Sequence, residues 1–190
     1  MKKVVGYFLV ALVIASCSSE VEDSKVDGIT PEYLLEQINV MDDSLNVLME
    51  KVMKEPNAKI DRLVYHEAAM RNITFYQTFP DHELAPEAIE KAASMYMAIG
   101  LDERATEWRD SLLLHYPDYS NILTILELQK SFYDNFDRYE PKMIQKYCDM
   151  MLDLGDALDS NKRKDIEFRL EHIDLSFIDL IKMQNPDLEL

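Results

Sequence analysis

Glycine and cysteine are both scarce, since a chain of 190 residues contains only four and two of them. So little glycine argues against tight β-hairpin turns, and no stretch alternates convincingly between polar and apolar residues as a half-buried strand would. Two cysteines are also too few for a framework of several disulfides. The sequence therefore predicts an all-α fold that does not rely on cross-links.

The motifs of catalysis and metal binding are missing as well. His66 and Glu67 begin like a zinc-protease helix, but Met70 stands where the second histidine is required. There is no glycine-rich phosphate loop and no nucleophile elbow. Thirty-six Asp and Glu residues produce carboxylate pairs by chance, so such pairs identify no acid–base couple. We predict a protein that is not an enzyme and uses no cofactor or metal; a pocket holding His66 or His115 against a carboxylate would favour an enzyme instead.

Positive charge is in short supply. Lys and Arg total 20 against 36 Asp and Glu, which gives a formal net charge of −16. Such a surface is repelled by phosphate backbones, so we expect no nucleic-acid partner, and it does not favour lying flat on anionic lipid. The acidity either steers basic partners or simply keeps the protein soluble, and the second interpretation needs fewer assumptions.

The only long apolar run lies near the N-terminus. Lys2 and Lys3 precede the run from Val4 to Ala15, which has the composition of a secretory signal peptide but is shorter than the roughly 20 residues that span a bilayer. We expect residues 1–16 to be this signal peptide, and its removal would change the formal net charge from −16 to −18.

The end of the apolar run resembles the lipobox of bacterial lipoproteins, with an aliphatic residue and two small residues before a cysteine: Ile14, Ala15, Ser16 and Cys17. The resemblance implies that signal peptidase recognises the first three and that Cys17 carries the lipid that holds the protein to a membrane. A single bound chain is a marginal anchor, whereas several chains are stable. Cys148 is then left without a disulfide partner in the chain and is expected to be a small buried apolar residue.

Residues 17–29 read as the lipidated cysteine followed by a flexible acidic tether, because they are polar and have no apolar periodicity. Within the lipoprotein resemblance, Ser18 after the cysteine implies the outer membrane. The acids Glu20, Glu22 and Asp23 are similar to the export tract of surface lipoproteins of Bacteroidetes. A cell-envelope location follows, with the periplasmic face and the cell surface both left open.

Residues 30–190 are expected to form a single helical domain. Thr30 and Pro31 suit a helix N-cap and first position, and later prolines fall where helices should begin or end. Apolar residues then recur in steps of three and four, as on one face of a helix. The predicted helices span 31–54, 58–78, 86–100, 102–115, 120–136, 141–155 and 159–172, with a last short one after Ser176.

A shift of 37 residues places the triplet Phe79-Pro80-Asp81 on Tyr116-Pro117-Asp118, which indicates an internal repeat. The segment 83–117 resembles a tetratricopeptide repeat, in which Arg109 departs from an aromatic position that Trp108 beside it could fill. The flanking units 57–80 and 120–154 are degenerate, and the helices 31–54 and 159–185 would cap the array. Another register pairs Pro86–Gly100 with Pro141–Gly155 but leaves a gap between units. The residues predicted to pack between repeats are Ile89, Ala92, Ala93, Tyr96, Gly100, Ala105, Pro117, Ala68, Pro80 and Tyr133.

The repeat resemblance implies a right-handed stack of antiparallel helix pairs, a tetratricopeptide-like α-solenoid with about seven or eight helices. In such a stack each repeat packs on the next, and the extended surface that results serves as a scaffold for other proteins. We therefore expect a lipid-anchored scaffold that binds another envelope protein in a groove between helices, with the groove residues left unassigned. The alternative is a surface-exposed lipoprotein that binds glycans or host ligands for an uptake system.

Overall fold

The computed structural model describes residues 28–55, 59–135 and 137–185. Within these ranges the protein is entirely helical, with eight α-helices, one short 3₁₀ helix and no strand, so the predicted all-α class is confirmed. The predicted signal peptide 1–16, the lipidation site Cys17 and nearly all of the tether lie outside the described residues. None of the described helices is both long enough and apolar enough to cross a membrane.

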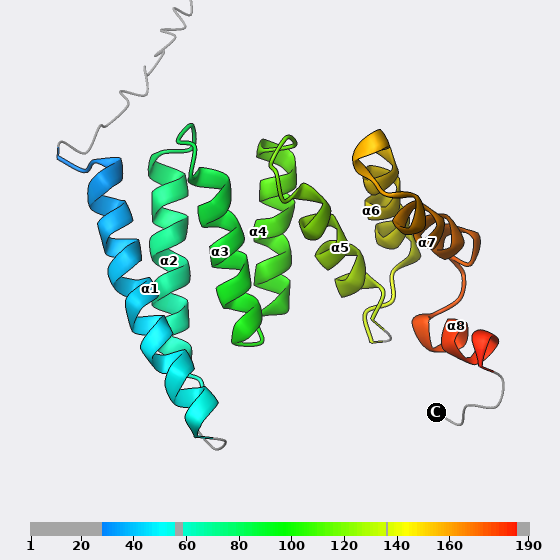
Figure 1. Ribbon diagram of the computed structural model, residues 1–190, viewed down its shortest axis with the longest axis horizontal. Coiled ribbons are helices and arrows are strands. Elements are labelled where there is room, and N and C mark those ends of the chain that lie inside the picture. Colours follow the sequence, from blue (N-terminus) through cyan, green and yellow to red (C-terminus); the bar gives the residue numbers. More distant parts are fainter. Residues whose placement is uncertain (1–27, 56–58, 136, 186–190) are drawn as a thin grey trace, which may run out of the picture.

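The helices follow one another in a row in the order of the chain, and each packs mainly against its neighbours in sequence (Figure 1). Their bounds are α1 Pro31–Lys54, α2 Arg62–Thr78, α3 Ala85–Ala98, α4 Asp102–His115, α5 Ile122–Tyr133, α6 Pro141–Asp153, η1 Gly155–Ala157, α7 Ser160–Glu171 and α8 Phe177–Gln184.

Side-chain caps fix several helix starts. Thr30 accepts a hydrogen bond from the Tyr33 amide at the start of α1, and Asp159 caps α7 in the same way. In α2 the carboxylate of Asp61 accepts from the amides of Leu63 and Val64. This cap begins α2 at Arg62, so the predicted start at residue 58 was too early.

Helix α5 is shorter at both ends than the predicted range 120–136. Before it, Tyr119 and Asn121 direct their side chains to Glu90 of α3. After it, the chain leaves the helix at Asp134, whose carboxylate binds Arg169 of α7. Contacts with distant helices, which local sequence does not reveal, therefore set both ends of α5.

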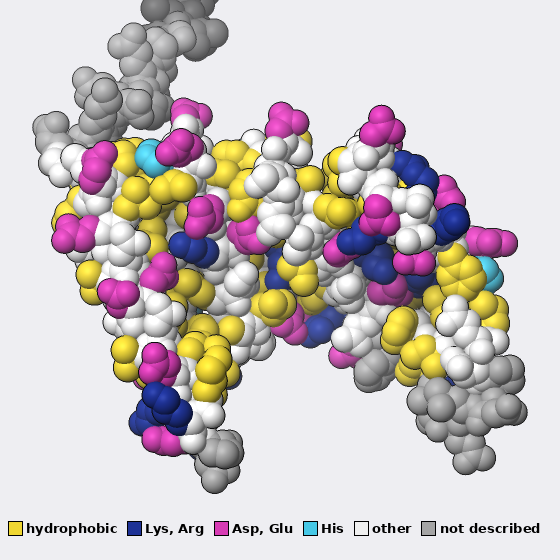
Figure 2. All heavy atoms as spheres, in the orientation of Figure 1, with side chains coloured by type: hydrophobic (Ala, Val, Ile, Leu, Met, Phe, Trp, Pro, Cys, Tyr) yellow, Lys and Arg dark blue, Asp and Glu magenta, His cyan; other side chains and the backbone are white. Residues whose placement is uncertain are grey.

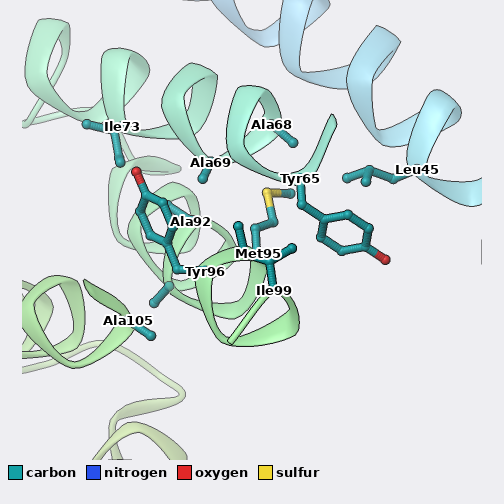
Figure 3. Packing of buried hydrophobic residues seen from close by; sticks show 11 residues of the cluster. Leu45, Tyr65, Ala68, Ala69, Ile73, Ala92, Met95, Tyr96, Ile99 and Ala105 are labelled. Atoms are coloured by element: carbon teal, nitrogen blue, oxygen red, sulfur yellow. The ribbon is translucent and has the colours of Figure 1, made fainter. Parts of the chain in front are cut away.

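Small side chains fill the core between α2, α3 and α4. Ala68 and Ala69 of α2 are fully buried against α3, where Ala92 and Ala93 are also buried, and Ala105 of α4 closes the layer (Figure 3). Alanines at a helix contact let the two backbones approach closely. The larger residues of this cluster lie around the alanines: Leu45, Tyr65, Ile73, Met95, Tyr96 and Ile99.

Larger side chains fill the core from α4 onward. Tyr147 and Cys148 of α6 are fully buried, as expected for Cys148. The pKa of the Cys148 thiol is raised to about 11, chiefly because burial disfavours the thiolate. The other buried members of this cluster are Ile89, Leu112, Leu113, Ile125, Leu126, Ile144, Met151, Leu158 and Ile166.

Gly100 ends α3 in the left-handed region, with φ of +72°. The amide of Leu101 donates to the carbonyl of Tyr96, a long closing bond that requires such a turn and that glycine adopts without strain. Gly155 has φ of +60° and leads into η1 instead. The two glycines thus make different turns although they are equally spaced from Pro86 and Pro141.

Candidate binding groove across helix α3

Two pockets meet on α3 and form what we call the α3 groove. A pocket of about 400 Å³ lies over α2 and α3, and one of about 190 Å³ lies between α1, α2 and α3. They share Glu87 and Lys91 in their linings. The remaining lining residues are Tyr65, Glu90, Ser94 and Met95 in the first pocket and Leu35, Ile38, Asn39, Asn72, Leu84 and Ala88 in the second.

Lys91 is the cation of the groove and connects α1 to α3. Its Nζ lies 3.4 Å from Oδ2 of Asp42 and 3.2 Å from Oε1 of Glu87. Partial burial lowers the Lys91 pKa, but the two carboxylates more than offset this, so the pKa stands above its ordinary value. All three groups remain partly exposed, so the pairs contribute at most about 1 kcal/mol each and mainly orient the side chains.

Glu90 connects α3 to the start of α5. The hydroxyl of Tyr119 donates to its Oε2 at 2.6 Å, and the side-chain amide of Asn121 donates to its Oε1. Burial and the hydrogen bond to Glu90 both raise the pKa of Tyr119. The groove is therefore lined by two carboxylates, those of Glu87 and Glu90, and one cation, Lys91, which is also paired with Asp42 beside the groove.

Asn72 adds a buried polar group to the smaller pocket. It is 1% exposed, and its Nδ2 donates to the carbonyl of Ala68 at 2.9 Å. Its Oδ1 has no hydrogen-bond partner among the described residues. A buried amide oxygen that lacks a partner favours any ligand that brings a donor.

The lining of the α3 groove is mixed in chemical character. Apolar and polar side chains both line the groove, and the described lining residues include no nucleophilic side chain hydrogen-bonded to a general base. No group of three or more His, Cys, Asp or Glu in the described part of the chain could hold a metal ion. His66 lies edge-on to Tyr96, and His115 contacts the carbonyl of Ser111. Neither histidine forms an ion pair with a carboxylate of the described residues.

The predicted repeat residues lie apart from this groove. Ile89, Ala92, Ala93, Tyr96, Ala105 and Ala68 are buried in the helix contacts, Tyr133 is half-buried, and Gly100, Pro80 and Pro117 are exposed at helix ends. Arg109, which departs from the aromatic pattern, is 3% exposed with its guanidinium 3.2 Å from Met97 Sδ. Burial lowers its pKa, and Trp108 lies beside it against Tyr76.

Sequence reasoning did not identify the groove residues. A usable signal was nevertheless present on α3, because Glu87 and Lys91 are one turn apart and point away from the apolar positions Ile89, Ala92 and Ala93. Asp42 and Tyr119 carry no comparable signal, since their importance depends on where distant helices lie.

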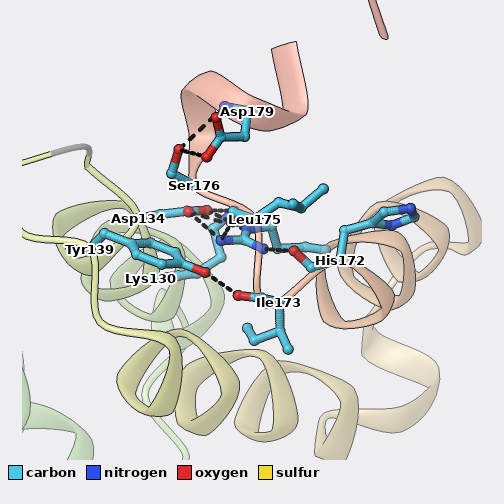
Figure 4. Close-up of polar contacts among 9 residues, drawn as sticks. Lys130, Asp134, Tyr139, His172, Ile173, Leu175, Ser176 and Asp179 are labelled. Atoms are coloured by element: carbon cyan, nitrogen blue, oxygen red, sulfur yellow. Dashed lines mark hydrogen bonds and ion pairs between the residues drawn. The ribbon is translucent and has the colours of Figure 1, made fainter. Parts of the chain in front are cut away.

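A second polar cluster lies near the C-terminus. The guanidinium of Arg169 binds both carboxylate oxygens of Asp134 and donates to the carbonyls of His172 and Leu175 (Figure 4). Tyr139 donates to the carbonyl of Ile173. These bonds attach the α7–α8 connection to the end of α5. A pocket of about 430 Å³ beside the cluster is lined by Lys130, Ser131, Asp134, Asn135, Phe177 and Ile178.

Four aromatic rings also lie close together, one from α2 and three from α4 and its C-cap, and all but His115 are half-buried. Tyr76 of α2 lies 6.2 Å from Trp108, 6.4 Å from His115 and 6.2 Å from Tyr116, measured between ring centroids. Tyr116 donates to the carbonyl of Pro80 and is thereby fixed. Trp108, His115 and Tyr116 are near one another in the sequence, but their grouping with Tyr76 depends on the tertiary structure.

Comparison of the chain with models of protein families, with curated proteins and with solved structures finds no match.

Proposed function

We propose that this protein is a lipid-anchored scaffold of the cell envelope that binds a segment of another protein in the α3 groove. The observation that carries the proposal is the groove itself, in which apolar side chains, the carboxylates of Glu87 and Glu90 and the ammonium of Lys91 line pockets on three helices. Peptides bind such surfaces through apolar anchors and a few oriented polar groups.

The helix arrangement is proposed to be a right-handed stack of the tetratricopeptide type. Support comes from the way each helix packs on its neighbours in sequence and from two hydrogen bonds between residues 36 or 37 positions apart. The hydroxyl of Tyr147 donates to Asp110, 37 residues earlier, and Tyr116 donates to the carbonyl of Pro80, 36 residues earlier. Stacked repeats leave one face hollow, and ligands commonly bind there.

The anchor is proposed to be a lipid on Cys17. It is supported by the order Ile14, Ala15, Ser16, Cys17 after a short apolar run. Mass spectrometry of the protein from membranes should find acyl chains on Cys17, and Cys17→Ser should release the protein into the soluble fraction. An unmodified Cys17 in membrane-derived protein contradicts the anchor without affecting the groove.

Site-specific crosslinking tests the groove. A photoreactive residue at Ser94, which is exposed in the lining, should yield one defined protein adduct in intact envelopes. The same probe at Leu114, exposed on α4, is the control and should not yield it. Glu87→Gln should reduce the Ser94 adduct. An adduct pattern that is the same at both positions contradicts binding in the groove.

A glycan ligand is the second candidate, and the cluster of Tyr76, Trp108, His115 and Tyr116 favours it, because aromatic rings pack well on sugar faces. Trp108 fluorescence on titration with envelope or host glycans tests it. The glycan candidate would be favoured over the peptide candidate by two results together. The fluorescence change would be saturable and lost in Tyr76→Ala, and the probe at Ser94 would give no protein adduct.

A further inference from the structure

The outer side of α1 carries a stripe of apolar residues that no described part of the chain covers. Tyr33, Val40 and Val47 are 51%, 55% and 69% exposed. They are spaced seven residues apart, so they lie along nearly the same line on the helix. The core side of α1 is separate and is formed by Ile38 and Leu45. We call these three residues the α1 stripe.

The position of the stripe makes its exposure unusual. α1 is the first helix of the row and packs against α2 on one side only (Figure 1). Terminal helices of stacked arrays ordinarily present a polar outer face, because an apolar one invites association. An α-helix of 24 residues is about 36 Å long, which is long enough for a partner helix to dock along it.

A row of carboxylates runs beside the stripe in the same spacing. Glu36, Asp43 and Glu50 each follow a stripe residue by three positions, and all three are exposed. Glu50 pairs with Lys54 at 3.1 Å, a contact between two highly exposed groups that water screens strongly. Figure 2 shows hydrophobic and acidic side chains interleaved along α1, with basic ones gathered toward its C-terminal end.

We propose that the α1 stripe docks an amphipathic helix of another protein whose apolar residues are flanked by lysines or arginines. The apolar stripe supplies the contact area, and the row of carboxylates selects a basic flank and rejects an acidic one. The surface is separate from the α3 groove, so its test does not depend on the function proposed above.

A second copy of this chain fits the surface less well. Antiparallel pairing about a two-fold axis brings the carboxylate row of one copy against the same row of the other, which is repulsive. Parallel pairing sets the row against the other flank of α1, formed by Gln37, Ser44 and Lys51, which offers a single cation. The charges therefore favour a different, basic helix over self-association.

The test uses the full chain with Cys17→Ser, so that no lipid can be attached there, and a designed peptide with leucines at heptad spacing flanked by lysines. Fluorescence anisotropy should show saturable binding that is at least tenfold weaker for Val40→Ser with Val47→Ser. Leu114→Ser removes an exposed apolar residue on α4 and is the matched control, which should bind like the parent.

Charge variants test whether the carboxylate row selects a basic peptide or whether the α1 stripe binds any apolar helix. Glu36→Gln with Asp43→Asn and Glu50→Gln should weaken the lysine-flanked peptide about tenfold, whereas Glu107→Gln with Asp118→Asn and Asp153→Asn should not. A peptide with the same leucines and flanking glutamates should not bind. Equal binding of both peptides, or no binding of the lysine-flanked one, overturns the proposal. Self-association in sedimentation that Val40→Ser abolishes would assign the stripe to a second copy instead.

Discussion

The two halves of the helix row are held together by different means. In α2, α3 and α4, buried alanines such as Ala68, Ala92 and Ala105 bring the backbones close. Among the described residues, the buried Asn72 and Arg109 of these helices reach only a carbonyl of the same helix or a methionine sulfur. From α4 onward the contacts use large side chains and directional bonds, with Tyr147 donating to Asp110 and Gln129 to the carbonyl of Thr106. Close packing of small residues repeats easily, whereas each directional bond needs its own pair of residues.

This difference offers a physical reason why the repeat pattern predicted from the sequence is clearer in one half than in the other. A small residue at a helix contact tolerates little variation in size, so the pattern persists in the sequence. In the second half Gln129 and Lys130 stand 37 residues after Ala92 and Ala93. Gln129 donates to the carbonyl of Thr106 on α4, a contact between helices that an alanine side chain cannot make. If this difference is the reason, the N-terminal half should be most sensitive to the volume of its buried side chains, and the C-terminal half to the loss of polar contacts.

The largest effect is expected in the C-terminal half from Asp134→Ala. This substitution leaves the guanidinium of Arg169 buried without its carboxylate and should lower the free energy of unfolding by about 3–5 kcal/mol. Urea denaturation measures it. Replacing both residues with leucine removes the charges together and should recover most of the loss. A loss below about 1 kcal/mol for Asp134→Ala would mean that the pair does not hold α7 in place.

Alkaline pH should weaken the same half through Cys148. Its pKa rises from its ordinary value of 9.0 to about 11 in the folded protein, so folding favours the protonated thiol. This stabilisation is complete below pH 9 and is lost as the pH rises through 11, amounting to roughly 2–3 kcal/mol at most.

Comparing the pH dependence of unfolding in the parent and in Cys148→Ala measures this contribution, because other alkaline groups are common to both proteins. The two curves should converge or cross above pH 9. Parallel curves would show that the thiol titrates alike in the folded and unfolded states.

Overpacking should damage the N-terminal half. Ala105→Leu forces a larger side chain between α3 and α4 and should cost about 1–3 kcal/mol of unfolding free energy. Ala98→Leu is the control, since Ala98 is exposed near the end of α3 and should change stability by less than about 0.5 kcal/mol. Equal stabilities of the two variants would show that the helices can separate to admit the extra volume.

The smallest expected effect compares the two turn glycines. Gly100→Ala and Gly155→Ala place a side chain at φ of +72° and +60°, with no atom within 4 Å of the added Cβ. Each should cost about 1 kcal/mol in backbone strain alone, and asparagine at either position should cost less. Thermal unfolding measures both. A much larger loss at one glycine would indicate a packing role that the open surroundings do not suggest.

Local sequence patterns anticipated most of the secondary structure. Thr30 and Ser176 cap helices as expected of short polar side chains, and the apolar period of 31–54 matches α1. The predicted start of α2 was wrong, because the sequence does not distinguish Asp61 as a cap from nearby residues. The predicted ends of α5 were also wrong, in part because Asp134 binds Arg169, 35 residues later. The α3 groove was not predicted at all, since its lining comes from three helices.

The sequence by itself determined that the described chain is helical, where most helices begin, and which faces are apolar, because these depend on interactions within one or two turns. Only the tertiary structure decided which distant polar groups meet, as Lys91 does with Asp42 and Glu90 with Tyr119. Such pairs form when packed helices bring side chains together, and a linear pattern does not contain the distance between them. The exposure of the α1 stripe was likewise decided by where α1 stands in the row.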